Sequence, residues 1–155
     1  MLIFYTGAIR TGKTTTVSNV CADRPDVSGF VTPDNELGKR VMRFFPSSET
    51  IEFETESSDC VEVGLRFKFS KTAFARGNEL ISQFSSSQFK FLVIDELGRF
   101  ELVKRSGFYE AFKNLKLRSD QKAIVIVREE LVEQAINEFG GIAVRNKEEL
   151  ERAMQ

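Results

Sequence analysis

The chain of 155 residues contains no histidine. Without an imidazole it cannot carry out Ser-His-Asp or Cys-His catalysis, build a histidine-containing zinc site or operate a histidine-based pH switch. Cysteine is also scarce. The chain has two, Cys21 and Cys60, which are far apart in the sequence. Two thiols without a Cys-x-x-Cys spacing suit a reducing compartment and predict no soft-metal site.

Long apolar runs and an excess of one charge are missing as well. The longest apolar runs are five residues, 1–5 and 123–127, whereas about 18 are needed to span a bilayer. Twenty-two Lys and Arg against 23 Asp and Glu give a net charge of −1, so no bulk field attracts nucleic acid or acidic membranes. The start of the chain lacks the pattern of a signal peptide. We expect a cytoplasmic protein that binds neither nucleic acid nor membrane, and the sequence indicates no protein partner.

The composition that remains is that of an ordinary globular domain, with 41% hydrophobic and 29% charged residues. We find no repeat, linker or low-complexity tract. The chain is therefore predicted to form a single domain over residues 1–155.

Short apolar runs and amphipathic stretches alternate along most of the chain. Runs at 2–5, 89–94, 122–127 and 142–144 predict strands that are buried on both faces. Helical spacing predicts a helix after each of the first three, and Asn146 with Glu149 gives a capping-box-like start for a terminal helix. This alternation predicts an α/β domain with right-handed crossovers.

The middle of the chain has a different pattern. Turn-forming residues at 33–38 separate the apolar stretches 29–32 and 40–45, which predicts a hairpin. Residues 51–53 and 61–69 alternate between apolar and polar, and we interpret each as a strand with one wet face. A helix capped by Ser70 or Thr72 follows. Residues 29–69 are thus predicted to be an antiparallel elaboration of the α/β domain.

A glycine-rich stretch after the first predicted strand fits G-x-x-x-x-G-K-[ST], the phosphate-binding loop. The glycines let backbone N–H groups point at a phosphate, and the helix that follows adds its positive end. Lys13 would reach the β and γ oxygens, and the Thr14 hydroxyl would ligate Mg²⁺. The predicted nucleotide-binding residues are Gly7, Ala8, Ile9, Arg10, Thr11, Gly12, Lys13, Thr14 and Thr15.

Two carboxylates, Asp95 and Glu96, follow the apolar run 91–94. Acidic residues at strand ends often only cap helices or solvate loops. Beside a phosphate-binding loop, however, Asp95 is predicted to hold Mg²⁺ directly or through water. Glu96 would orient or deprotonate the attacking water, a role that a protein which only holds nucleotide does not need. The pair therefore favours hydrolysis.

Arginines and phenylalanines offer weaker signals. Arg10, Arg99 or Arg128 could stabilise charge on the γ-phosphate, and the strand-end position favours Arg128, although each also fits an ordinary surface arginine. Among the 15 phenylalanines, Phe67, Phe69 and Phe74 offer rings for stacking a nucleobase. Because the phenylalanines mostly follow helical spacing, we interpret them as core and predict no base pocket.

Three stretches together resemble the nucleoside-triphosphatase family that includes the cancer-related nucleoside-triphosphatase. They are the loop that ends at residues 12–15, the Gly-Phe-Val-Thr of residues 29–32 followed by Gly38 and Arg40, and the acid-pair stretch 95–102. The resemblance covers residues 2 to about 112. It implies a RecA-like P-loop fold, a three-layer sandwich with a mostly parallel central sheet. It also implies slow Mg²⁺-dependent hydrolysis of ATP, GTP and other nucleoside triphosphates to diphosphate and phosphate, with a glutamate at the position of Glu96.

Two other functions remain open at this point. In a small-molecule or nucleoside kinase the same loop would bind the donor, Glu96 would deprotonate an acceptor hydroxyl, and the segment around Lys71 and Arg76 would belong to a lid. In a nucleotide-switched partner protein the output would be a conformational change. Neither is excluded by the sequence.

Overall fold

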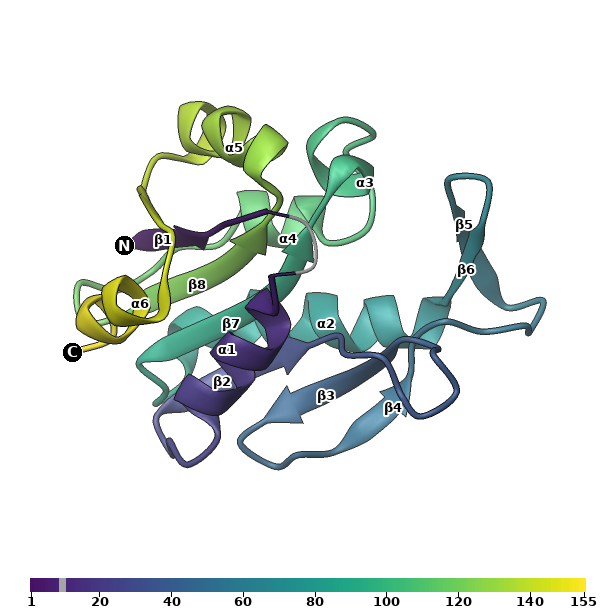
Figure 1. Cartoon of the computed structure of the whole chain (residues 1–155), viewed down its shortest axis with the longest axis horizontal. Coiled ribbons are helices and arrows are strands. Elements are labelled where there is room, and N and C mark those ends of the chain that lie inside the picture. Colours follow the sequence, from purple (N-terminus) through teal and green to yellow (C-terminus); the bar gives the residue numbers. More distant parts are fainter. Residues whose placement is uncertain (9–10) are drawn as a thin grey trace.

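The structure is a computed structural model that describes residues 1–8 and 11–155. Its strands form one seven-stranded sheet in the order β4-β3-β2-β7-β8-β1-β9 and a separate two-stranded hairpin, β5-β6 (Figure 1). The strands are β1 (Leu2–Tyr5), β2 (Val27–Val31), β3 (Val41–Phe45), β4 (Thr50–Glu52), β5 (Cys60–Val63), β6 (Phe67–Ser70), β7 (Phe91–Leu97), β8 (Lys122–Val127) and β9 (Ile142–Val144).

Helices connect these strands and cover both faces of the sheet. The α-helices are α1 (Lys13–Cys21), α2 (Lys71–Gln83), α3 (Arg99–Leu102), α4 (Tyr109–Lys113), α5 (Val132–Phe139) and α6 (Lys147–Ala153), and two short 3₁₀ turns are η1 (Phe84–Ser86) and η2 (Glu129–Leu131). Residues of α1 and α6 pack in one hydrophobic cluster, and residues of α2, α4 and α5 pack in the other. The predicted three-layer α/β architecture is confirmed.

The central strands contribute to both clusters. In β1, Phe4 packs with the α2 side, whereas Ile3 and Tyr5 pack with the α1 side. All three side chains are buried, because successive residues of a strand point to opposite faces and both faces are covered by helices. The continuous apolar runs in the sequence, without polar alternation, follow from this double burial.

The pairing of strands agrees with the predicted division of the chain. β1 pairs in parallel with β8 and β9, and β7 pairs in parallel with β2 and β8. β3 and β4 extend the sheet in antiparallel fashion beyond β2, as the turn-forming residues 33–38 predict. The fold is therefore a mostly parallel sheet with an antiparallel extension at one edge.

One part of the secondary-structure prediction is wrong. Residues 61–69 do not form a single strand, because Gly64 adopts a φ of +66° and the chain turns there. Val61 faces Phe69, and Val63 faces Phe67, across the β5-β6 hairpin. The alternation of apolar residues continues through the turn, so it did not reveal the reversal. The hairpin stands away from the sheet at the right of Figure 1.

The register of the parallel strands decides where the ends of the strands meet. Tyr5 and Asp95 both align with Ile126, so β1, β8 and β7 finish side by side. The phosphate-binding loop leaves β1 at this edge, and Arg128 follows β8 there. Ligands of open α/β sheets bind at the carboxyl ends of strands.

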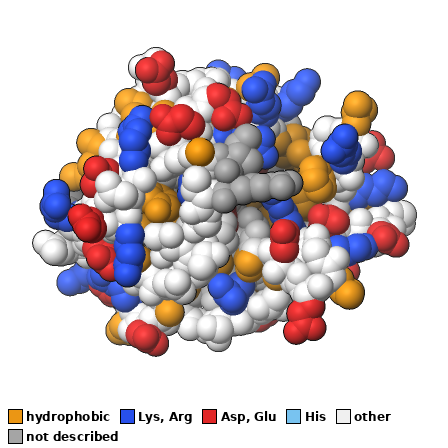
Figure 2. All heavy atoms as spheres, in the orientation of Figure 1, with side chains coloured by type: hydrophobic (Ala, Val, Ile, Leu, Met, Phe, Trp, Pro, Cys, Tyr) orange, Lys and Arg blue, Asp and Glu red, His pale blue; other side chains and the backbone are white. Residues whose placement is uncertain are grey.

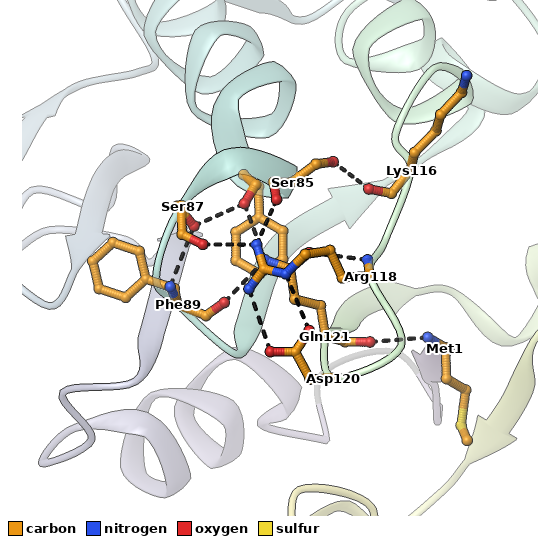
Figure 3. Close-up of polar contacts among 9 residues, drawn as sticks. Met1, Ser85, Ser87, Phe89, Lys116, Arg118, Asp120 and Gln121 are labelled. Atoms are coloured by element: carbon orange, nitrogen blue, oxygen red, sulfur yellow. Dashed lines mark hydrogen bonds and ion pairs between the residues drawn. The ribbon is translucent and has the colours of Figure 1, made fainter.

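A polar network fixes the opposite edge, where the strands begin (Figure 3). The Arg118 guanidinium donates to the carbonyl of Ser87 at 2.9 Å and to that of Ser85 at 2.5 Å. Gln121, which is buried, donates from Nε2 to the carbonyls of Phe84 and Phe89, both at 3.1 Å. These bonds attach the loop before β8 to the segment between α2 and β7.

Charged side chains of both signs are intermixed over the face shown in Figure 2. This agrees with the net charge of −1. Within residues 1–8 and 11–155, no helix is long and apolar enough to cross a membrane.

Candidate functional site

The loop between β1 and α1 ends at Gly12, where the chain turns into the helix. Gly12 precedes α1 with a φ of +74°, a left-handed conformation that glycine adopts without steric cost. The Lys13 ammonium donates to the carbonyls of Gly7 at 3.2 Å and Ala8 at 2.9 Å, so it lies over its own loop. The predicted binding residues Ile9 and Arg10 lie outside the described residues.

Asp95 is buried at the end of β7 and connects three parts of the chain. Its Oδ2 accepts the Thr14 hydroxyl at 2.8 Å and the backbone N–H of Thr32 at 3.0 Å. Burial raises the pKa of Asp95, and the neighbouring Glu96 adds to the rise, while the two hydrogen bonds oppose it. A divalent cation in contact with this carboxylate would favour its ionised form. The two residues predicted to ligate Mg²⁺ therefore touch each other.

Glu96 lies between two arginines. Arg128 donates from Nε to Oε1 at 3.0 Å, and Nη1 of Arg40 is 3.8 Å from Oε2. Two of the three predicted catalytic residues, Glu96 and Arg128, thus lie in one cluster with Arg40, whereas the third, Lys13, lies over the phosphate-binding loop. Arg40 lies just before β3. No role is predicted for Arg40 from its neighbours in the chain, although its place in the stretch that resembles the nucleoside-triphosphatases is an available signal.

Glu101 is a third carboxylate close to the acid pair, and no role was predicted for it. Its side chain is 4% exposed, and its two oxygens accept the backbone N–H groups of Gly98 at 3.1 Å and Phe108 at 3.2 Å. Burial raises the pKa of Glu101 to about 7. The carboxylate ties the segment that follows the acid pair to the start of α4. The role of Glu101 depends on tertiary contacts, so the residues next to it in the sequence do not indicate that role.

A cavity of about 670 Å³ separates the loop from the acid pair. The predicted residues Thr11, Gly12, Lys13, Thr14, Thr15, Asp95, Glu96 and Arg128 all line it, together with Thr32, Pro33, Asp34, Arg40 and Ile126. Arg99 does not line it and is exposed on α3. The structure thus brings residues 11–15 of the loop, the acid pair and Arg128 to one cavity, whereas the predicted binding residues Gly7 and Ala8 are not among the residues that line it.

The loop, the helix that follows it and the acid pair on β7 define a P-loop α/β protein. The chain belongs to the NTPase family, whose model matches residues 2–150. A solved structure with a similar fold is that of THEP1 from the hyperthermophile Aquifex aeolicus, with a TM-score of 0.71 and 16% sequence identity over 100% of this chain and 97% of that chain. No curated protein matches the sequence.

Proposed function

We propose that this chain hydrolyses nucleoside triphosphates to diphosphate and phosphate in a Mg²⁺-dependent reaction. Its membership of the NTPase family supports hydrolysis of this substrate class. The observation that carries the proposal is the 2.8 Å hydrogen bond between Thr14 and Asp95, with Glu96 next in the chain. It brings the helix that follows the phosphate loop into contact with the acid pair, as phosphoryl transfer requires.

The donor set at this contact fits Mg²⁺. One hydroxyl oxygen and one carboxylate oxygen are hard ligands, and Mg²⁺ in nucleotide sites commonly takes one or two protein oxygens with phosphate and water as the rest. Thr14 and Asp95 would hold the ion. When bound, it would neutralise charge on the phosphate oxygens.

The remaining roles follow from charge and position. Lys13 would exchange the carbonyls of Gly7 and Ala8 for phosphate oxygens, which are stronger partners for an ammonium. The carboxylate of Glu96 would accept the proton of the attacking water. Arg128 and Arg40, which flank Glu96, are within reach to stabilise charge that develops on the γ-phosphate.

The decisive experiment measures phosphate release from ATP, GTP, CTP and UTP with Mg²⁺ and with EDTA. Glu96→Gln should retain nucleotide binding and lower release by about 10²–10⁴-fold, the usual contribution of a general base. Lys13→Ala should impair both binding and release.

The matched control is Glu133→Gln, which makes the same change on an exposed position of α5. It should release phosphate at the wild-type rate. Unchanged release by Glu96→Gln would remove Glu96 from the mechanism. Absence of release from every triphosphate, despite tight binding, would overturn the proposed hydrolysis.

A further inference from the structure

A second cavity, of about 180 Å³, lies next to the site. Its walls are aromatic and come mainly from the segment between β2 and β7 and from the segment that follows the acid pair. The rings that line it are those of Phe53, Phe67, Phe69, Phe74, Phe100 and Phe108. Helical spacing predicts that the phenylalanines belong to the core, and most of these six are buried, yet they surround a space.

The rings are held in fixed orientations by one another. Phe53 stacks on Phe69 with centroids 4.4 Å apart and meets Phe74 edge-on at 5.3 Å. The Phe67 ring is parallel to that of Phe69, with centroids 5.7 Å apart, and Phe67 is 42% exposed, so it lies at the rim. Such walls favour a flat ring that can stack or meet them edge-on.

The aromatic cavity is continuous with the catalytic cluster. Five residues line both cavities, namely Thr32, Arg40, Asp95, Glu96 and Arg128. The larger cavity is also lined by residues of the phosphate loop, whereas the smaller one is also lined by the phenylalanines. Glu96 therefore lies between Lys13 and the aromatic walls.

The nucleobase of the triphosphate is an unsuitable occupant for this cavity. In a phosphate loop the lysine reaches the β- and γ-phosphates while the backbone holds the α and β groups. The γ-phosphate of a bound triphosphate would therefore point toward Asp95 and Glu96, with the base at the far end of the molecule. The aromatic cavity would then lie beyond the γ-phosphate, on the side from which the group that attacks phosphorus must approach.

We propose that this cavity binds a second substrate, an alcohol that carries a single aromatic ring, and that the chain transfers the γ-phosphoryl group to it. The inference rests on the proposed function, because it uses the same bound triphosphate and the same Glu96. The alcohol oxygen forms a bond to the γ-phosphorus, and the bond from that phosphorus to the β–γ bridging oxygen breaks. The hydroxyl proton passes to the Glu96 carboxylate, and the products are a phosphate monoester and the nucleoside diphosphate.

Size and charge set the substrate class. Pockets for drug-sized ligands measure roughly 300–1,000 Å³, so about 180 Å³ suits one ring with a short arm and not a whole nucleotide. Arg99 also lines the cavity and is exposed, and within the part of the chain that the structure describes it has no ion-pair partner. It is available to an anionic or polar substituent at the mouth.

The test uses three probes, benzyl alcohol, 2-phenylethanol and pyridoxine, each of which carries one aromatic ring and at least one hydroxyl group on a short arm. Binding is measured by ligand-observed NMR without nucleotide, and transfer is followed with γ-³²P-labelled ATP and Mg²⁺. Val63→Phe adds a ring inside the cavity. Leu65→Phe makes a similar addition at the exposed turn of the same hairpin and serves as the control.

We expect at least one probe to bind wild type and Leu65→Phe equally, to bind Val63→Phe at least tenfold more weakly, and to collect label as a phosphate monoester. Thermal unfolding shows whether Val63→Phe is folded. If it is not, Phe67→Ala at the rim is the substitute, with the same expected loss of binding. Failure of all three probes to bind wild type, equal binding by the cavity variant, or label in inorganic phosphate alone overturns the inference. Phosphate release without any probe reports separately on the proposed hydrolysis.

Discussion

The hydroxyl of Thr14, in the first turn of α1, donates to Oδ2 of Asp95 on β7 at 2.8 Å. The two residues are 81 positions apart in the chain. Their contact depends on the sheet order, because β8 lies between β1 and β7 and all three strands end at the same edge. The two proposed Mg²⁺ ligands are consequently positioned by the fold itself.

Removal of the Thr14 hydroxyl should weaken the metal site. We expect Thr14→Ala to raise the Mg²⁺ concentration for half-maximal phosphate release by about tenfold or more, which corresponds to roughly 1.4 kcal/mol. Thr14→Ser retains the hydroxyl and should stay close to wild type. A Mg²⁺ titration of each variant measures the effect. Equal behaviour of the alanine and serine variants would show that the hydroxyl is not a ligand.

The arginine beside Glu96 should matter for catalysis and little for stability. Arg128 is 44% exposed, and exposed ion pairs contribute about 0–1 kcal/mol. Arg128→Ala should therefore unfold near the wild-type temperature while kcat falls by about 10²–10³-fold, the range for loss of one donor that stabilises transition-state charge. Arg76→Ala, on α2, breaks the pair with Glu49 and is the control, which should leave kcat unchanged. A large drop in unfolding temperature with Arg128→Ala would indicate a structural role instead.

Glu101 should make the stability of the fold depend on pH. Its ordinary pKa is 4.5, and burial raises it to about 7, with the Glu96 carboxylate adding to the rise. Between these values the folded chain retains a proton that the unfolded chain has lost. The free energy of unfolding should therefore fall as pH rises from 4.5 through 7, by roughly 3 kcal/mol from this group.

Urea unfolding of wild type and Glu101→Gln between pH 4.5 and 8 isolates this contribution. The variant loses the titrating group, so its stability relative to wild type should rise with pH. Glu133→Gln, at an exposed position, should follow the wild-type profile. Parallel profiles for wild type and Glu101→Gln would show that Glu101 titrates near its ordinary pKa.

The network at the opposite edge of the sheet should contribute to stability without affecting turnover. Gln121→Leu removes the donor for the carbonyls of Phe84 and Phe89 in a buried environment, and we expect a loss of about 2–3 kcal/mol. Arg118→Ala removes hydrogen bonds to exposed carbonyls and should lower the free energy of unfolding by about 1 kcal/mol or less. Urea unfolding ranks the two variants, and the reverse order would contradict the assignment of burial.

Gly77, in the middle of α2, should resist the change to alanine. Alanine gains up to about 1 kcal/mol in helix propensity, but its Cβ would lie 2.5 Å from Cε1 of Phe108. Displacing that packed ring should cost about 1–3 kcal/mol, so the net effect is destabilising. Ser82→Ala, at an exposed position of the same helix, should stabilise slightly. Thermal unfolding of both variants checks the difference.

Much of the fold could be predicted because its strands are buried on both faces and leave an unbroken apolar run. The prediction failed for residues 61–69, because one pattern of alternating apolar and polar residues is compatible with two backbone structures. The alternation of residues 61–69 holds in a continuous strand, and it holds equally in a hairpin whose turn preserves the facing of side chains. β7 also extends to Leu97, past the predicted end of its apolar run, because Asp95 and Leu97 continue the pairing with β8.

The same distinction applies to the residues of the site. The loop residues and the acid pair could be predicted, because residue type and spacing along the chain are enough to identify them. Arg40 and Glu101 lie in stretches that resemble the nucleoside-triphosphatases, but the sequence does not show what either side chain contacts. What they contact is decided by sheet order and by the packing of α2 and α4.

The sheet ends in two strands of three residues each, β4 and β9. An edge strand exposes unpaired backbone N–H and C=O groups to other molecules. Because a strand of three residues has few such groups, a second chain can form few hydrogen bonds with it. The folded protein should consequently resist aggregation through its sheet edges at high concentration. Exposure of β8, whose Ala-Ile-Val-Ile-Val run is buried between two partners, would remove that protection. Loss of solubility on heating should therefore coincide with unfolding and not precede it.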